Sequence, residues 1–263
     1  MNWREYYYTL SWERTYWRRA TKVITLTDED KKMVRHVEHE VDVPNGIDHE
    51  TSIYPPGSSR TKSTAEWNRH MSIQCNTCSS ILFVCNFEYG PNVDAALYFS
   101  RSIFHLILNR VPNTILFLVG NSPPDEVLAL MNGNHLYSHI KVTGYVESLD
   151  PFYEAAHVVV CPLRIGGGIK VKILEALKAA KAIVSTSGGA QGLNLDSKAL
   201  CICDSVSDFA NNVIRLLINS QERHLQEQEA ILLMRTFPTW RQIAEEYIYC
   251  YCKIVPTLYQ KKF

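Results

Sequence analysis

Short β-rich runs alternate with helical stretches from about residue 80 onward, and this alternation constrains the fold more than any other feature of the sequence. The runs are ILFVCN, TILFLVG, IKVTGYV, HVVVCPL, AIVST and ALCIC, and amphipathic stretches separate most of them. Strands that alternate with helices form βα units on a parallel sheet. Because the runs are almost continuously apolar, we expect helices on both faces of an α/β parallel sheet.

A glycine-rich loop, RIGGGIKVKILEAL (residues 164–177), follows the run HVVVCPL. Lys170 and Lys172 fall where the next helix begins, and cations at a helix N-terminus cost roughly 0.3–1 kcal/mol each. A bound anion would offset this cost, because glycines let the backbone approach a phosphate and helix N–H groups point at it. Ligands of open parallel sheets bind beyond the carboxyl ends of the strands. We therefore expect a phosphate site here, with a surface turn and solvated lysines as the alternative.

Two charged residues of the following helix share one face. Lys172 and Glu175 are three residues apart, so a simple surface pair worth a few tenths of a kcal/mol is one interpretation. In the other, Lys172 meets phosphate while Glu175 accepts hydrogen bonds from the vicinal hydroxyls of a ribose.

The composition excludes several classes of protein. With 263 residues, 46% hydrophobic and 21% charged, the chain is globular rather than disordered. Lys plus Arg equals Asp plus Glu at 27 each, so no whole-chain charge favours nucleic acid. No apolar run approaches the ~20 residues that span a bilayer, and the N-terminus lacks the apolar core of a signal peptide. We expect a cytoplasmic protein.

The cysteines are expected to be reduced structural thiols, since most of them fall in apolar strand-like runs. Cys75 and Cys78 form half of a zinc site, but no second pair has the matching spacing, so we expect no metal site. The cysteines are Cys75, Cys78, Cys85, Cys161, Cys201, Cys203, Cys250 and Cys252.

The first 60 residues form a separate piece. An aromatic, arginine-rich helical stretch precedes the strand KVITLT, a helix that opens with TDED, and the strand-like VDVPNGID. One strand and two helices cannot bury a core alone, so this piece must dock on something else. The segment YPPGSSRTKST, residues 54–64, has the composition of a linker.

Several motifs carry a family resemblance when they are taken in order. They are VDVPNGID, FVCNFEYGPNVDAALYF, FLVGNSPP, VTGYVESLDPFYEAAHVVVCPLRIGGGIKVKILEALKAAKAIVST and GGAQGL, within roughly residues 13–254. The series resembles the nucleotide-sugar-dependent, retaining glycosyltransferases of the GT-B fold, the family 4-like group often labelled "glycosyl transferases group 1". VDVPNGID is similar to the family's interdomain segment, and the other motifs follow its C-terminal domain.

The resemblance implies a domain division and a reaction. Residues 1–53 would be the remnant of the N-terminal acceptor domain with the interdomain segment, 54–77 a linker, and 78–263 a Rossmann-like nucleotide-sugar-binding domain with C-terminal helices. The implied reaction moves a sugar from a nucleoside diphosphate donor to an acceptor hydroxyl with retention, without a cofactor or an obligatory metal. Because most of the family's N-terminal domain is missing, we expect weak or absent turnover. The alternative is a non-catalytic nucleotide-sugar-binding module that needs a partner domain.

The same resemblance assigns roles to residues. Glu175 matches the second carboxylate of the family's Glu, seven residues, Glu motif and would contact ribose hydroxyls, while Lys172 and Arg164 would neutralise the diphosphate. The candidate catalytic residues are Arg164, Lys172 and Glu175. The candidate donor-binding residues are Asn86, Gly144, Tyr145, Val146, Gly166, Gly167, Gly168 and Ile169. Asn92 also falls near the expected phosphates or sugar, with helix capping as an equally good explanation.

Four positions depart from the family pattern. The glycine run replaces the first glutamate of the two-carboxylate motif. Cys85 stands where a glycine normally follows the first strand, which would narrow backbone access to the diphosphate. Ala180 replaces another usual glycine, which suggests a change in packing or in the turn, and Gln191 replaces a common glutamate.

The aromatic and basic N-terminal stretch, REYYYTLSWERTYWRR, leaves two interpretations open. It suits a helix at the inner face of the membrane, and it suits equally a helix packed into the absent domain, which we favour. The expected partners are a nucleoside diphosphate sugar and a hydroxyl acceptor, with no nucleic acid. Residues 1–50 are the expected surface for a peripheral membrane or a partner chain.

Overall fold

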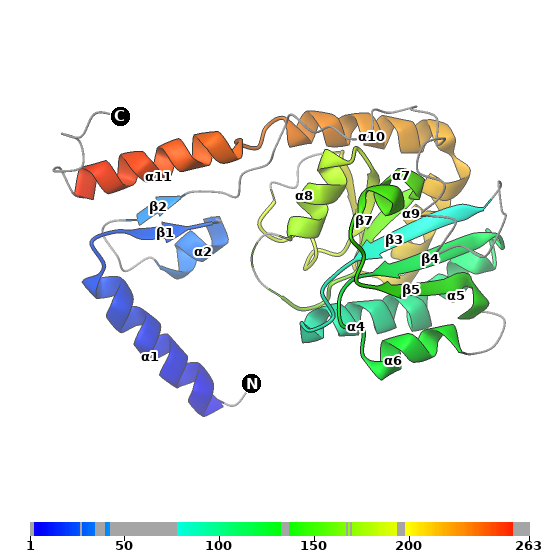
Figure 1. The fold of residues 1–263 in the computed structure, drawn as a ribbon, viewed down its shortest axis with the longest axis horizontal. Coiled ribbons are helices and arrows are strands. Elements are labelled where there is room, and N and C mark those ends of the chain that lie inside the picture. Colours follow the sequence, from blue (N-terminus) through cyan, green and yellow to red (C-terminus); the bar gives the residue numbers. More distant parts are fainter. Residues whose placement is uncertain are drawn as a thin grey trace. The chain divides into compact units, whose positions relative to one another are not determined.

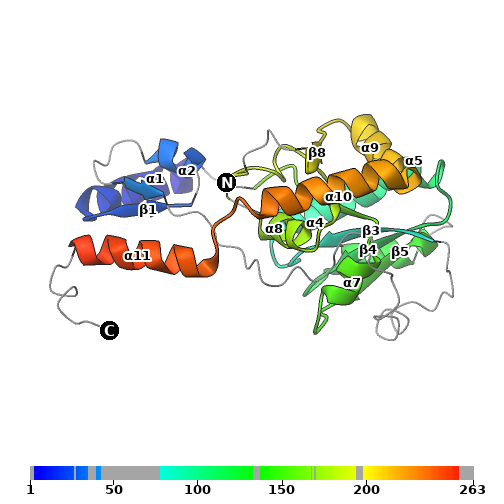
Figure 2. The same ribbon diagram turned by 90° about the horizontal axis from the view of Figure 1, so that it is seen from above.

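A computed structural model describes residues 3–26, 28–34, 40–42, 78–132, 137–166, 168, 170–193 and 198–254. The chain divides into two compact units (Figures 1 and 2). One unit comprises residues 49–236, and the other combines residues 1–48 with residues 237–263.

The larger unit is built on a six-stranded, entirely parallel sheet with the order β5-β4-β3-β6-β7-β8. Its strands are β3 (Ser79–Val84), β4 (Thr114–Val119), β5 (Ile140–Gly144), β6 (Val158–Cys161), β7 (Ala182–Ser185) and β8 (Leu200–Ile202). Each of them coincides with one of the apolar runs. The chain adds strands outward from β3 in one direction and outward from β6 in the other. The strand order therefore reverses between β3 and β6, as in Rossmann folds.

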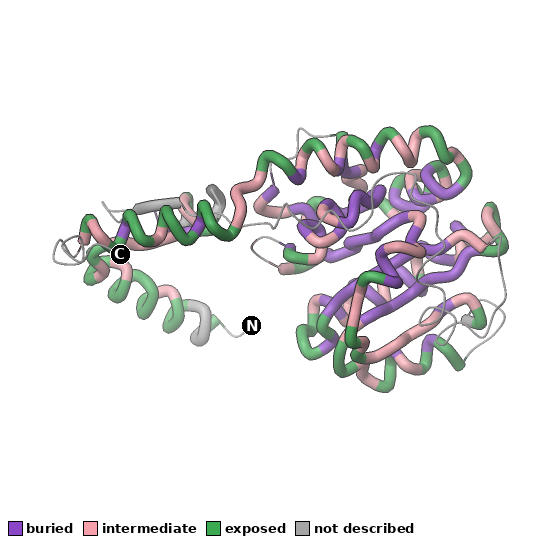
Figure 3. Tube along the Cα trace, turned by 45° about the horizontal axis from the view of Figure 1, so that its top comes forward, coloured by how far each residue is buried: buried purple, intermediate pink, exposed green. Residues whose placement is uncertain are grey.

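Helices connect the strands and cover both faces of the sheet. Every residue of β4 and β6 is buried (Figure 3), and successive side chains of a strand point to opposite faces. The helices are α4 (Gly90–Tyr98), α5 (Phe104–Leu108), α6 (Asp125–Leu128), α7 (Asp150–Ala155), α8 (Val171–Lys178), α9 (Val206–Ile218) and α10 (Ser220–Met234). A π-helical turn, Phe99–Ile103, joins α4 to α5, and single 3₁₀ turns cover Ala129–Met131 and Tyr137–His139. The predicted α/β, Rossmann-like fold is confirmed.

The end of α8 shows the effect of one departure from the family pattern. Ala180, two residues after the helix, is buried and has a φ of 51°. This left-handed conformation costs an L-residue roughly 1–2 kcal/mol, whereas glycine adopts it freely. The alanine therefore occupies a turn that favours glycine.

The smaller unit contains α1 (Trp3–Arg19), β1 (Val23–Thr25), α2 (Asp28–Met33), β2 (Glu40–Asp42) and α11 (Trp240–Ile254). Strands β1 and β2 pair in parallel. The expected helix, strand and helix are all present, but α11 groups with them, whereas the sequence-based division kept it with the sheet. The proposed origin of residues 1–53 stays a prediction, and the linker 54–77 lies outside the described residues.

Two expectations about the whole chain can be compared with the structure. Within the described segments, no helix combines the length and apolar character needed to cross a membrane. The free thiols are Cys85, Cys161, Cys201, Cys203, Cys250 and Cys252. Cys78 is disulfide-bonded, so the expectation of a reduced thiol is wrong there. It precedes β3 and is only half-buried, unlike the buried Cys85 directly after β3 and Cys161 in β6, and Cys75 lies outside the described residues.

Candidate active site

The candidate site lies at the carboxyl ends of β3 and β6, where the strand order reverses. The loop after β3 leads into α4, and the glycine-rich loop after β6 leads into α8. Neighbouring parallel strands whose connections diverge leave a crevice between their loops, which is the usual ligand position in such sheets. The fold thus brings two loops about 80 residues apart in the sequence to one place.

Lys172 is the side chain on which the two loops converge. It is the second residue of α8, and its Nζ donates a hydrogen bond of 2.7 Å to Oδ1 of Asn92 on α4. The same Nζ lies 4.6 Å from the centroid of the Phe83 ring on β3. Burial lowers the pKa of the Lys172 ammonium. A half-buried cation at the start of a helix is thus held at the end of β3.

Glu175 follows one turn later and is half-buried. Its Oε2 accepts a hydrogen bond of 3.2 Å from the hydroxyl of Tyr153, a buried residue of α7. Burial raises the pKa of the Glu175 carboxyl, while the Tyr153 hydrogen bond and the charge of Lys172 oppose that shift. Lys172 and Glu175 are both described and do not form an ion pair, so the surface pair suggested by their spacing is not what the structure contains.

Arg164 is held by α4. Its guanidinium forms a two-point ion pair with Asp94, with Nε–Oδ2 at 3.0 Å and an Nη2–Oδ1 distance of 2.5 Å. Its Cζ lies 4.5 Å from the centroid of the Tyr98 ring. The hydrogen bond to Asp94 raises the pKa of Arg164. Arg164 therefore borders the site but directs its donors at Asp94.

The described part of the glycine-rich loop surrounds a second lysine. Gly166 and Gly168 have φ values of 135° and 69°, which glycine adopts most readily. Lys170 precedes the first residue of α8, and its Nζ donates a hydrogen bond of 2.8 Å to the carbonyl of Gly168. A Cβ added to Gly166 would lie 3.7 Å from both the Lys170 Nζ and the Tyr89 hydroxyl. Lys170 is buried and precedes α8, so the solvated lysine considered as the alternative is wrong at this position.

Gly167 and Ile169, whose backbones were expected to line the diphosphate, lie outside the described residues.

Gly144, Tyr145 and Val146 lie at the same edge of the sheet but on a more distant strand. Gly144 ends β5, the outermost strand on its side, and has a φ of 70°. Tyr145 is exposed and Val146 half-buried. These residues are two strands away from β3, so the structure does not group them with Lys172.

The loop after β3 contributes its backbone. The Asn86 side chain is exposed, and its Oδ1 accepts a hydrogen bond from the Glu88 backbone N–H. The backbone carbonyl of Asn86 accepts a hydrogen bond of 2.6 Å from Nδ2 of Asn92. The N-cap of α4 is Tyr89, so the capping role considered for Asn92 is wrong. Cys85 is buried, which raises the pKa of its thiol to about 12.

Sequence reasoning missed Asp94 and Tyr153, which bond the two predicted site residues Arg164 and Glu175. Their contacts join α4 and α7 to segments far away in the sequence, and no local pattern marks them.

Comparison with known proteins identifies the family. A family model described as "Glycosyl transferases group 1" matches residues 78–219, just over half of the chain. The chain belongs to this family. A relative, the uncharacterized 44.6 kDa protein in the cps region of Klebsiella pneumoniae, is 22% identical over 142 residues and is matched over 36% of its length.

Solved structures of glycosyltransferases share the fold. Sucrose-phosphate synthase from Thermosynechococcus elongatus is 17% identical with a TM-score of 0.75, over 94% of this chain and 62% of that one. HepE of Anabaena, in complex with UDP and glucose, is 13% identical with a TM-score of 0.71. The match covers 93% of this chain and 66% of HepE. The C-terminal domain of a glycosyl transferase group 1 family protein from Francisella tularensis is 18% identical with a TM-score of 0.54. The match covers 73% of this chain and 97% of that domain. The group 1 chain described here thus spans less than two thirds of the synthase.

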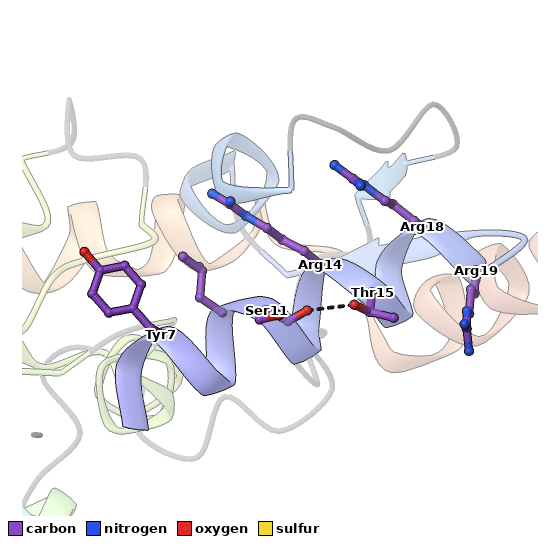
Figure 4. A pocket seen from close by; sticks show the side chains of 7 residues that line it. Tyr7, Ser11, Arg14, Thr15, Arg18 and Arg19 are labelled. Atoms are coloured by element: carbon purple, nitrogen blue, oxygen red, sulfur yellow. Dashed lines mark hydrogen bonds between the residues drawn. The ribbon is translucent and has the colours of Figure 1, made fainter. Parts of the chain in front are cut away.

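A cavity of about 520 Å³ lies beside α1 in the smaller unit (Figure 4). Its described lining comes entirely from that helix: Tyr7, Leu10, Ser11, Arg14, Thr15, Arg18 and Arg19. The Thr15 hydroxyl donates to the Ser11 carbonyl within it. No described residue of the sheet lines this cavity.

Proposed function

We propose that this chain binds the nucleoside diphosphate sugar donor of a retaining glycosyltransferase at the carboxyl ends of β3 and β6. The observation that carries the proposal is the Lys172 ammonium, held 2.7 Å from Asn92 at the first turn of α8. A diphosphate is the chemical group that best matches a half-buried cation beside the N–H groups of a helix start. The HepE relative, with UDP and glucose bound, supports this class of ligand.

Each side chain of the site then has a proposed role. Lys172 and the first N–H groups of α8 stabilise the negative charge that develops on the diphosphate as the bond between the sugar and its oxygen breaks. Glu175, oriented by Tyr153, accepts hydrogen bonds from the ribose hydroxyls through Oε1, for which the described residues provide no partner. Arg164 adds positive charge once it leaves Asp94.

Retention, independence from a metal and the donor itself remain proposals from the family. Among the described residues, no three His, Cys, Asp or Glu side chains are grouped to hold a metal ion. The contact of residues 1–50 with a membrane or a partner chain is likewise a proposal. Exposed aromatic side chains on α1 support it, namely Trp3, Tyr7, Tyr8, Trp12 and Tyr16.

The proposal is tested by saturation-transfer NMR of the purified chain with UDP-, GDP- and ADP-sugars. We expect saturation of the ribose and sugar protons of one donor, and a weaker ribose signal in Glu175→Gln. No saturation with any donor would contradict the proposal. If sugar is released from an α-linked donor, an α product supports retention and a β product contradicts it. Binding without release would favour the alternative of a binding module that needs a partner domain.

Replacing Asp94 by asparagine is expected to strengthen binding of the preferred nucleoside diphosphate about fivefold. The exposed Arg164–Asp94 pair is worth about 1 kcal/mol at most, and its loss frees the guanidinium for the ligand. Asp125→Asn on α6 removes the same charge from a residue that does not bond Arg164 and should leave affinity unchanged. Weaker binding by Asp94→Asn in a calorimetric titration would instead mean that Asp94 holds Arg164 in its productive place.

A further inference from the structure

We propose that Asn92 is a positioning residue that holds the Lys172 ammonium in place for the diphosphate of the donor. The identity of the ligand rests on the function proposed above. The inference about Asn92 itself rests on its burial, its two hydrogen bonds and its place between two loops.

The hydrogen bonds of Asn92 fix the orientation of its amide. A backbone carbonyl only accepts, so the group facing the Asn86 carbonyl at 2.6 Å must be the NH₂ group of Asn92. An ammonium only donates, so the group facing Lys172 at 2.7 Å must be the amide oxygen. Both partners therefore require the same rotamer and the same orientation of the amide.

Burial makes this arrangement specific. Asn92 is only 7% exposed. If its amide lost either partner, a buried polar atom would have no hydrogen bond to protein or water, which costs free energy. The two partners come from different segments, the loop after β3 and helix α8. Asn92 therefore links the segments that together form the site.

Asn92 has no evident role in forming its own helix. It is the third residue of α4, whose N-cap is Tyr89, and asparagine is a poorer helix former than alanine. The side chain is used instead for contacts outside the helix. The Asn92 side chain therefore serves the contacts with Asn86 and Lys172 rather than the stability of its own helix.

Lys172 retains donors for a ligand. An ammonium has three N–H groups; one points to Asn92, and the Phe83 ring lies 4.6 Å away. No other described residue accepts a hydrogen bond from Lys172. The remaining donors can therefore meet phosphate oxygens.

The Lys172 ammonium is bonded to no carboxylate of the described residues. The titratable groups that face it are Cys85 after β3, Cys161 on β6 and Glu175 on α8. Burial raises the pKa of both thiols, to about 12 for Cys85, so they are neutral near pH 7. Glu175 is the charged neighbour of the three, and its carboxylate bonds Tyr153 rather than Lys172. An anionic ligand would give the Lys172 ammonium the directly bonded counter-charge that these residues do not supply.

The test measures Lys172 first without and then with a ligand. In nucleotide-free protein labelled with ¹³C at lysine Cε, Asn92→Ala should lower the pKa of Lys172 by about one unit, because the ammonium loses its acceptor. Asn92→Asp should raise that pKa, because a carboxylate replaces the amide. Asn211→Ala, at an exposed position of α9, is the control and should change nothing.

Titrations with UDP, GDP, ADP and inorganic pyrophosphate between pH 7 and pH 10 complete the test. Binding needs the charged ammonium, so affinity falls as pH rises through the pKa of Lys172. We expect Asn92→Ala to bind the preferred probe about tenfold more weakly than the wild type at pH 7. We also expect its affinity to fall at a pH about one unit lower than in the wild type. A merely structural role would lower affinity without moving this pH.

The outcomes separate the two proposals. An unchanged pKa of Lys172 in both Asn92 variants would overturn the positioning role whatever the chain binds. If the Asn92 variants shift the pKa of Lys172 but the wild type binds none of the four probes, the donor site is overturned, and with it the proposal that Asn92 positions Lys172 for a diphosphate. If Asn92→Ala does not fold, Asn92→Asp provides the same comparison with the opposite sign.

Discussion

Replacing Lys172 by alanine is expected to weaken binding of the preferred nucleoside diphosphate by about 10- to 100-fold. Hydrogen bonds to charged groups contribute about 1.5–3 kcal/mol, and each 1.36 kcal/mol is tenfold in affinity. Lys172 donates to Asn92 and retains further donors at the start of α8, where a phosphate would also meet the helix N–H groups. Isothermal titration calorimetry at pH 7 measures the effect.

Lys178→Ala is the matched control for this variant. Lys178 is the last residue of α8, seven positions from the helix start, so its loss removes the same charge from the other end of the same helix. We expect its affinity to stay within about twofold of the wild type. Equal losses in Lys172→Ala and Lys178→Ala would mean that net charge, rather than the position of Lys172, governs binding.

Replacing Gly120 by alanine is expected to destabilise the larger unit by about 3 kcal/mol or more. A Cβ at this position would lie only 1.5 Å from the carbonyl oxygen of Cys85. The sheet fixes that carbonyl, since the Cys85 N–H donates to the Val119 carbonyl at 2.9 Å. Overpacking costs typically 1–3 kcal/mol and more where backbone must move.

The melting temperature checks this expectation. For a domain of this size, 3 kcal/mol corresponds to a fall of roughly 6–12 °C. Gly90→Ala is the control, because a Cβ at Gly90 meets no atom within 4 Å. A melting temperature for Gly120→Ala equal to that of Gly90→Ala would show that β3 and β4 can separate at their ends, against the packing described here.

The sheet could be predicted because its signal is local. Most of the strands are almost continuous apolar runs, which a sheet buried on both faces requires, and the fully buried β4 is the clearest case. The outermost strand β5, with Lys141 and Thr143, is the exception. The same pattern predicted where the candidate site would lie, since the glycine-rich loop follows the end of β6.

The connections inside the site could not be predicted, because they depend on packing between distant segments. Arg164 meets Asp94 across 70 positions, and Lys172 meets Asn92 across 80. Lys170 was expected to face solvent or a ligand, but its Nζ bonds the Gly168 carbonyl only two residues away. The conformation of the folded loop determines which partners a long charged side chain meets. The sequence pattern does not predict that conformation.

The grouping of α11 was missed for a related reason. Its sequence has an apolar face like those of the helices that cover the sheet, and nothing in that face identifies which unit it packs on. The structure groups α11 with residues 1–48. Periodicity predicts that a helix buries one side, and tertiary packing decides against what.

The donor site is tested most directly by a calorimetric titration of the purified chain with UDP, GDP and ADP, alongside the corresponding nucleosides. We expect one diphosphate to bind, its nucleoside to bind far more weakly, and Lys172→Ala and Glu175→Ala each to reduce the affinity. Binding of none of the three diphosphates, or binding that both substitutions leave unchanged, would contradict a donor site at the ends of β3 and β6.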